Sequence, residues 1–377
     1  GLEYNVGWYR VNHAPIGYAG RGFLLSKQGC LGERKLFFMK KFAKTFTAAA
    51  MIAAMALIAG CGGGSDKQAA SSGGKVTLKM AAHLPQSHPL VKAMQDLKAK
   101  TAEKSGGTLD IQIYPAGQLF NDKNMNDALI SGGVDMGLNT VGRWASIVPA
   151  MDVFDLPFLF PTYEKIGKAV DGGLGDKLGA ELQKKGVRPL IWADYGFVQF
   201  ANSKKPIQAP EDFAGLKIRG YSKYSTETIK ALGASSVTMG SGEVYMGIQR
   251  GTIDGQVSGT TAMRDRKMYE VTKYLTVTNH GCPEFLLAIN DKSYAKLNDQ
   301  QKKALTDAAK EVQQAIRDNA KKEDLKALDD LKAKGMEVYV VPEGELQKWR
   351  DATKSTWEQF VKETGKTGQE LIDICIK

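Results

Sequence analysis

The sequence predicts an α/β protein with two lobes, and three observations support this fold class. Apolar residues alternate and then follow helical spacing, in turn, over residues 75–140. The same succession of strand and helix returns over residues 215–259, and residues 297–335 are strongly helical. Strands and helices that alternate along a chain form parallel α/β layers, and two such series predict two lobes. With 377 residues and 43% hydrophobic content, the chain is long enough for two cores.

The first series starts with a strand in which Val76, Leu78 and Met80 alternate. A helix opened by Ser87 and Pro89 follows, and its apolar face consists of Leu90, Val91, Met94 and Leu97. The segment "TLDIQIYP" is a second alternating strand, "NDKNMNDALISGG" is a second helix, and "VDMGLNT" is a third strand. These elements form the first α/β half.

The second series consists of a strand in "GLKIRG", a helix in "STETIKALGA", a strand in "SSVTMG", a helix in "GEVYMGIQRG" and a strand in "TIDGQVSG". Gly233 and Gly251 end the two helices, since glycine is favoured just after a helix C-terminus. Residues 297–335 then predict a long helix whose apolar stripe consists of Leu305, Ala308, Ala309, Val312 and Ile316. Residues 336–365 add a strand and a terminal helix.

The residues before the first strand predict an export signal. Lys40, Lys41 and Lys44 precede an apolar run over residues 48–59, which is shorter than the roughly 18 to 20 residues that span a bilayer. The run ends in "LIAGC", which resembles the lipobox of bacterial lipoproteins and predicts a lipid on Cys61. An N-terminal transmembrane anchor is the alternative. We expect residues 1–38 to be a mis-assigned upstream extension, residues 39–60 to be the lipoprotein signal, and residues 61–74 to be a flexible tether.

The charge of the chain argues against nucleic acid as a partner. The 51 Lys/Arg and 41 Asp/Glu residues give a formal charge of +10. Residues 1–60 hold eight of the basic and two of the acidic residues, which leaves 43 against 39, or +4. No basic cluster is interleaved with aromatic residues, so a small anionic ligand fits better. After the leader only Cys282 and Cys375 remain; they can pair or stay separate, and no spacing predicts a metal or another cofactor.

Arg219 ends the apolar strand in "GLKIRG". In open α/β sheets the carboxyl ends of strands face the ligand crevice, where the following helices present positive dipole ends. A guanidinium is a permanent planar fork that matches a carboxylate, so this position suits an organic acid. A solvated surface arginine is an equal alternative on spacing alone.

Five segments resemble the extracytoplasmic solute receptors of tripartite ATP-independent periplasmic (TRAP) transporters: "YPAGQLFNDKNM", "FDLPFLF", "GLKIR", "LGASSVTMGSGEVYMGIQRGTIDGQ" and "YEVTKYLTVTNH". The similarity covers residues 76–368. It implies a periplasmic-binding-protein-like fold, with a ligand cleft between the lobes and long C-terminal helices that brace both. Such a receptor closes around one organic acid and delivers it to a membrane permease driven by an ion gradient. It is expected in the periplasm, tethered through Cys61, as a monomer.

The resemblance also implies the lobes and the site. Lobe I is expected to hold residues 75–196 and 284–323, and lobe II residues 197–283 and 324–377. Arg219 matches the family arginine that pairs with the ligand carboxylate. Arg143, in "NTVGRWAS", matches an arginine that approaches the ligand from the first lobe, with a structural ion pair as the alternative. His83 follows the first strand, where the family contacts ligand with varied residue types.

At other positions, a ligand-binding role as in the family and a purely structural role are both open. Asp122 could hold a ligand hydroxyl or, slightly favoured, cap the helix beside it. Thr140 could face the cleft or bond locally to the backbone. One or two aromatic residues entering the second lobe could face the ligand, although aromatic residues at strand spacing are more often core: Trp192, Tyr195 and Phe197.

The chain departs from the family at two positions. Val198 stands where many members have an arginine, and Ser258 stands where many have a ligand-contacting asparagine. Both losses weaken the case for a plain dicarboxylate or sialic acid. Tyr221, Tyr224 and Tyr245 could enrich the pocket in aromatic surface, which makes a monocarboxylate with an apolar or aromatic body a serious candidate.

Two other function classes remain as alternatives. A periplasmic hydrolase has little support, because residues 61–377 hold three histidines and no HExxH, G-x-S-x-G or P-loop pattern. Activity on acid esters would reveal it. A binding protein coupled to a sensor would be indicated by a neighbouring kinase gene without permease genes.

Overall fold

The computed structural model describes residues 74–377. The expected upstream extension, the signal, Cys61 and all of the tether except its last residue lie outside the described residues. The helices are α1 Pro89–Lys104, α2 Met125–Ser131, α3 Tyr163–Ala169, α4 Gly175–Gln183, α5 Lys223–Ala231, α6 Val244–Gln249, α7 Thr260–Asp265, α8 Asp291–Ala295, α9 Asp299–Ala333 and α10 Leu346–Ile376. The strands are β1 Val76–Ala82, β2 Leu109–Tyr114, β3 Met136–Thr140, β4 Val187–Asp194, β5 Val198–Asn202, β6 Lys217–Gly220, β7 Ser235–Thr238, β8 Gly255–Gly259, β9 Tyr274–Gly281, β10 Glu284–Asn290 and β11 Glu337–Val340.

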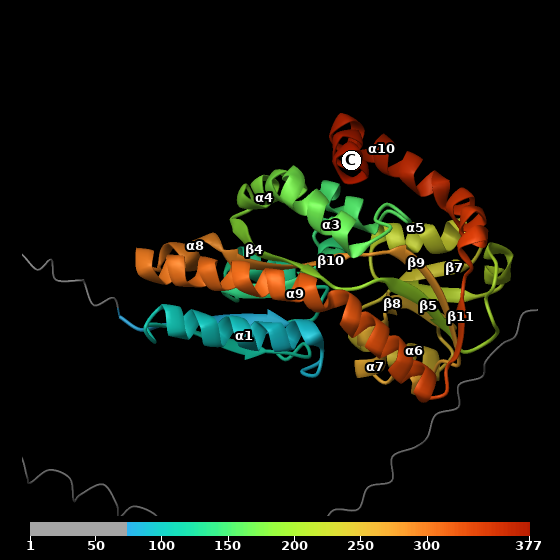
Figure 1. The fold of residues 1–377 in the computed structure, drawn as a ribbon, viewed down its shortest axis with the longest axis horizontal. Coiled ribbons are helices and arrows are strands. Elements are labelled where there is room, and N and C mark those ends of the chain that lie inside the picture. Colours follow the sequence, from blue (N-terminus) through green and yellow to red (C-terminus); the bar gives the residue numbers. More distant parts are fainter. Residues whose placement is uncertain (1–73) are drawn as a thin grey trace, which may run out of the picture. The chain divides into compact units, whose positions relative to one another are not determined.

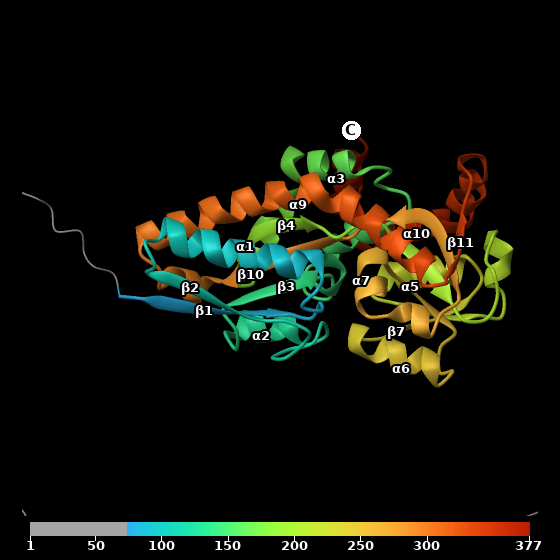
Figure 2. The same ribbon diagram turned by 60° about the horizontal axis from the view of Figure 1, so that its bottom comes forward.

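The first sheet has the strand order β2-β1-β3-β10-β4. β1 runs parallel to β2 and β3, whereas β10 runs antiparallel to β3 and β4. Successive side chains of a strand point to opposite faces, so Leu286 and Ala288 pack in one core and Leu287 and Ile289 in another. Figure 2 shows α1 and α9 over one face of this sheet and α2 against the other. Helices therefore cover both faces, as the strand and helix pattern predicts.

The second sheet has the strand order β11-β9-β5-β8-β6-β7. β6 is parallel to β7 and β8, and β5 is antiparallel to β8 and β9. Phe200 and Ile218 pack with Trp349 on one face, while Ala201 and Leu275 belong to a separate core on the other. Figure 1 shows this sheet beside the first, with α5 on one side and α6 and α7 on the other. The predicted two-lobe α/β fold is confirmed.

Long helices connect the two halves, as the family resemblance implies. α9 packs against α1 and β4 and then against α7, so Leu305 lies in a core of the first sheet and Leu331 in a core of the second (Figure 1). α10 places Trp349 against the second sheet and Leu371 in a core of the first. It kinks at Gly365, where φ is 61° and ψ is −140°, a conformation that glycine alone adopts readily.

The chain also crosses between the sheets twice through short links. Residues 195–197 join β4 to β5, and residues 282–283 join β9 to β10. Cys282 and Cys375 are both buried, and no disulfide joins them. Within residues 74–377, no helix has both the length and the apolar character required to cross a membrane.

Candidate functional site

A cavity lies where strand ends of both sheets meet. His83 follows β1, Thr140 ends β3, Arg219 lies in β6 and Ser258 in β8. A water-sized sphere can occupy about 40 Å³ of the cavity. Its lining is His83, Leu84, Asp122, Thr140, Tyr195, Arg219, Tyr221, Ser241, Ser258, Ala262, Arg266, Pro283 and Phe285. Six of the predicted site residues are thus brought together: His83, Asp122, Thr140, Arg219, Tyr221 and Ser258.

Arg219 is buried, with 3% of its surface exposed. Its Nε donates to the carbonyl of Met239 at 3.0 Å, and its Nη1 donates to the carbonyl of Val257 at 3.3 Å. A guanidinium has five N–H donors, so three remain. Among residues 74–377, Arg219 has no carboxylate partner within 4.0 Å. Burial lowers its pKa to about 10, which still leaves it cationic at neutral pH.

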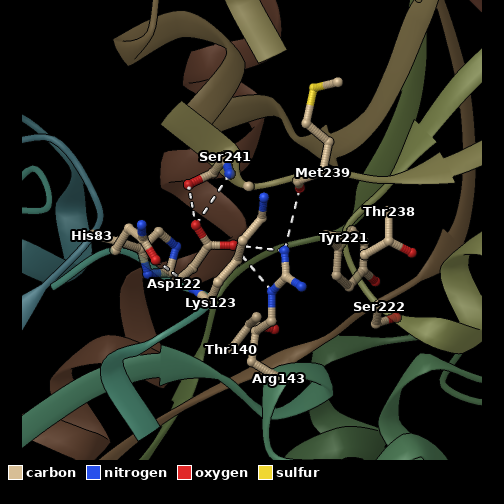
Figure 3. A network of polar contacts seen from close by, with 12 residues as sticks. His83, Asp122, Lys123, Thr140, Arg143, Tyr221, Ser222, Thr238, Met239 and Ser241 are labelled. Carbon is tan, nitrogen blue, oxygen red and sulfur yellow. Dashed lines mark hydrogen bonds and ion pairs between the residues drawn. The ribbon is translucent and has the colours of Figure 1, made fainter. Parts of the chain in front are cut away.

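Arg143 and Asp122 form a partly buried ion pair beside this cation (Figure 3). The Arg143 Nε and Nη2 donate to Asp122 Oδ2 at 3.0 and 2.8 Å. Nη2 also donates to the Met239 carbonyl at 3.2 Å, so Met239 accepts from both arginines. The other Asp122 oxygen accepts from the Ser241 N–H and hydroxyl, at 3.1 and 3.2 Å. The network therefore links the loops of the first half to the loop after β7 in the second.

Asp122 is ionised in this setting. Burial opposes its ionisation, but His83, Arg143, Arg219 and the Ser241 N–H together lower its pKa to about 2. The interpretation of Asp122 as a helix cap is wrong, since its oxygens are used by Arg143 and Ser241. Asn121 Oδ1 instead accepts the backbone N–H groups of Lys123 and Asn124 at the start of α2.

Aromatic rings form one wall of the cavity. The His83 ring stacks on Phe285 with centroids 5.5 Å apart, and Phe285 stacks on Tyr195 at 4.7 Å. Burial lowers the pKa of His83 to about 3, so its ring is neutral at pH 7. His83 Nδ1 and Thr140 Oγ1 have no hydrogen-bond partner among the described residues. The aromatic wall therefore suits a flat or apolar ligand body, and the two unpaired atoms of His83 and Thr140 are free to form hydrogen bonds with it.

Tyr221 joins the cavity to a buried carboxyl. Its hydroxyl donates to Asp155 Oδ1 at 3.0 Å, and burial together with this carboxylate raises the pKa of Tyr221. Asp155 ends the 3-10 segment Pro149–Asp155 of the first half, whereas Tyr221 directly follows β6 of the second. This hydrogen bond also crosses between the halves.

Four predicted site residues do not line the cavity. Trp192 stacks on Phe154 in the first core, at 5.7 Å between centroids. Phe197 stands edge-on to Tyr163 at 5.1 Å. The Tyr245 hydroxyl donates to Glu270 at 2.8 Å. Arg143 contacts the cavity through Asp122 rather than lining it.

Sequence reasoning missed Arg266, Phe285 and Ser241 as lining residues. Phe285 belongs to the buried strand β10 and Ser241 begins the 3-10 segment Ser241–Glu243, so neither carries a local signal. Arg266 follows α7, the helix after the β8 strand end. The strand-end rule concerns the N-terminal ends of the helices that follow strands, so it does not single out Arg266 at the C-terminal end of α7.

This cavity, placed at strand ends between two α/β halves and carrying a buried cation without a partner, defines a two-lobe solute-binding protein. The family model described as bacterial extracellular solute-binding protein, family 7 (DctP), matches residues 80–364. The chain belongs to this family, and it is an extracytoplasmic solute receptor of a TRAP transporter.

Relatives support this placement. The C4-dicarboxylate-binding periplasmic protein DctP of Rhodobacter capsulatus is 32% identical over 70% of this chain and 80% of its own length. The 2,3-diketo-L-gulonate-binding periplasmic protein YiaO of Escherichia coli is 31% identical over 67% of this chain and 76% of its own. The solved structure of a sugar acid binding protein from Advenella mimigardefordensis, in complex with galactonate, has a TM-score of 0.77 and 27% identity, and covers 80% of this chain and 98% of that one.

Within residues 74–377, no group of three or more His, Cys, Asp or Glu side chains is arranged to hold a metal ion. The charged groups at the cavity are mainly guanidinium cations.

Proposed function

We propose that this receptor captures a small organic acid by pairing its carboxylate with Arg219. The observation that carries the proposal is the buried Arg219 guanidinium, which faces the cavity with three N–H groups unused and no carboxylate partner among the described residues. A carboxylate would take two of them in a planar fork. The relatives named for C4-dicarboxylate, diketogulonate and galactonate support an acid as the solute.

Closure of the cleft would follow binding. We place lobe I at residues 75–196 and 284–323, and lobe II at residues 197–283 and 324–377, so the links at 195–197 and 282–283 are the hinges. Arg219 then belongs to lobe II, while His83, Asp122 and Thr140 belong to lobe I. Closing the lobes excludes water and strengthens the ion pair, because charges interact more strongly at low dielectric. The closed receptor would hand the acid to the permease for uptake driven by an ion gradient.

The finer location is also a proposal. We infer that the receptor is periplasmic, monomeric and held to a membrane through lipid on Cys61. Cys61→Ser should release the protein or block its processing, which fractionation of cells into membrane and soluble parts would show. Persistent membrane attachment of the variant would contradict the lipid anchor.

We further infer that the receptor binds its solute without converting it. Among the described residues that line the cavity, no hydroxyl is hydrogen-bonded to a histidine, and the neutral His83 has a pKa too low to act as a base at pH 7. Incubation with esters of the acids that bind should yield no product. Turnover would support the hydrolase alternative.

The solute can be found with a thermal-shift screen of dicarboxylates, sugar acids, 2-oxo acids and aromatic acids. A specific binder at 100 times its Kd adds about 2.7 kcal/mol to the free energy of unfolding. For the best acid, Arg219→Ala should weaken binding by about 2 to 5 kcal/mol, because the anion is left desolvated without a partner. Arg219→Lys should recover only part, since an ammonium lacks the fork.

A comparison of the acid with its amide separates direct pairing from a structural effect. The amide should bind wild type poorly and lose little further affinity in Arg219→Ala. Equal losses for acid and amide would overturn the role of Arg219, and so would a folded variant with wild-type affinity for the acid.

A further inference from the structure

Arg266 is a second cation in the cavity that no carboxylate neutralises. It directly follows α7 and lines the cavity together with Arg219. Its Nη2 donates to the carbonyl oxygen of His83 at 3.0 Å, which leaves four N–H donors. Among residues 74–377, it has no ion-pair partner within 4.0 Å, because neighbouring Asp265 is paired with Arg264 at 2.8 Å.

The charges around the cavity do not balance. Asp122 is the one carboxylate among the described lining residues, and Arg143 is bound to it. These two charges cancel, so Arg219 and Arg266 leave a surplus of two positive charges. His83 is neutral at pH 7 and adds nothing to this surplus. Arg219 is buried and Arg266 is half-buried. Charges withdrawn from water without partners are costly, so the surplus favours an anionic occupant that can match both cations.

The two cations lie on the same half of the protein. Arg219 belongs to β6, and Arg266 follows α7, which leads directly from β8, the strand next to β6 in the second sheet. Each guanidinium still has enough donors for a two-bond fork after its contacts to backbone carbonyls. Phe285 and Tyr195 line the same cavity and provide an apolar surface for the body of a ligand.

We propose that Arg266 is a second anion-binding residue, so that the solute carries two anionic groups, one paired with Arg219 and the other with Arg266. This inference rests on the proposed function and specifies its solute class. It replaces the monocarboxylate that the aromatic residues suggested, because such a ligand would leave the half-buried Arg266 guanidinium without an anionic partner. The contact with the His83 carbonyl would also connect the second anion to the first lobe.

The test measures binding of diacids and of their half-amides by calorimetry. The probes are succinate, glutarate and phthalate, each beside its monoamide, with the wild-type receptor, Arg266→Gln and Lys267→Gln. Gln keeps hydrogen-bond donors but removes the charge, and Lys267 is an exposed neighbour outside the cavity, which makes it a control for long-range electrostatics. In wild type, the diacid that binds best should have an affinity roughly 30-fold or more above that of its half-amide. This ratio should collapse in Arg266→Gln and survive in Lys267→Gln.

The outcomes separate this inference from the proposed function. If half-amides bind as tightly as diacids, or if the ratio survives Arg266→Gln, the second anion site is wrong while the Arg219 site stands. If Arg266 only holds the lobes together through the His83 carbonyl, Arg266→Gln would weaken the binding of diacid and half-amide by the same factor. That result would also overturn the inference. If no acid binds at all, both proposals fail. Should Arg266→Gln not fold, the wild-type ratio decides, because a diacid that uses one carboxylate gains only the statistical advantage of two equivalent ends.

Discussion

Asp122 is a single carboxylate on which several groups of the cleft depend. Its two oxygens take two N–H groups of Arg143 and two donors of Ser241, from opposite halves of the protein. Removing the charge would leave Arg143, 14% exposed at its side chain, as a half-buried cation without a carboxylate partner. At the scale of single residues, this pair sets the stability of the site.

We therefore expect Asp122→Asn to lower the free energy of unfolding by about 3 to 5 kcal/mol at pH 7. The native pKa of Asp122 is about 2, below the roughly 3.9 of an unfolded aspartate. Its contribution is thus complete above about pH 4 and is lost as the pH falls towards 2. Chemical denaturation at pH 7 and pH 3 measures the difference in the free energy of unfolding between variant and wild type. This difference should be smaller at pH 3 than at pH 7. Asp127→Asn, at an exposed position of α2, is the control; a difference that does not change with pH would contradict this account.

Two buried carboxyls next to the cleft have the opposite pH dependence. Burial, together with the charge of Asp155, raises the pKa of Asp152 to about 8, and burial raises the pKa of Asp155 to about 6. Because both values exceed the unfolded value of roughly 3.9, their contribution is complete below about pH 4 and is lost as the pH rises to 8.

Wild-type stability should accordingly fall between pH 5 and pH 8, by at most about 1.4 kcal/mol per pH unit for each carboxyl. Asp152→Asn keeps a neutral side chain of the same shape, so its stability should fall less over this range. Urea denaturation at several pH values between 5 and 8 gives the slope of the free energy of unfolding against pH for wild type and for the variant. Parallel slopes for variant and wild type would contradict the raised pKa of Asp152.

The sequence could indicate the residues at strand ends, and it could not indicate their partners. Arg219, His83 and Thr140 were predicted because each follows or ends a strand with clear alternation. The pairing of Arg143 with Asp122, and the arrival of Arg266 and Phe285 in the cavity, depend on contacts between residues far apart in the chain. No local pattern records such contacts, and Trp192 and Phe197 have the same aromatic spacing whether they face a ligand or a core.

At the scale of elements, α10 is one helix that serves two cores and bends at a single residue. Trp349 packs on the second sheet, whereas Phe360, before the kink, and Leu371, after it, both lie in a core of the first. Gly365 has φ 61° and ψ −140°, and an added Cβ would meet no neighbouring atom. A side chain at this position would therefore lower the free energy of unfolding through its strained backbone conformation and not through a steric clash.

Gly365→Ala should lower the free energy of unfolding by about 1 to 3 kcal/mol, because alanine avoids this backbone conformation. Gly344→Ala is a matched control, since its position is equally open and its φ is not positive. Thermal denaturation of both variants gives the comparison. Similar midpoints for the two would show that α10 bends without cost at this position.

The elements predicted from periodicity were confirmed, from the strand at Val76 to the helix that starts at Leu346. Their apolar spacing is a local property, and tertiary packing did not override it. The 3-10 segment Pro149–Asp155 and the short helices up to Gln183 carry no comparable period, and their form depends on the core into which Met151 and Phe154 are packed. Strand order was also beyond local patterns, because β10 lies between β3 and β4.

At the scale of the whole receptor, we expect the two short links and the long helices α9 and α10 to restrict motion between the lobes to hinge bending. Small-angle scattering of the receptor should therefore show a smaller radius of gyration with a saturating acid. Arg219→Ala at the same acid concentration should show no such change, because it lacks the ion pair that favours the closed state. A wild-type receptor that binds the acid without compaction would contradict closure.

The place of β10 has a consequence for how the chain reaches its native state. β10 is the strand that joins β3 to β4, yet Leu287 pairs with Leu138 only after the strands β5 to β9 have been synthesised. A nascent chain that ends before residue 284 has no strand to bridge the two parts of its first sheet. Ordering such distant contacts is slow, because the entropy of closing the long loop is lost before the pairing is gained. We therefore expect the strand order to delay folding until most of the polypeptide has been made.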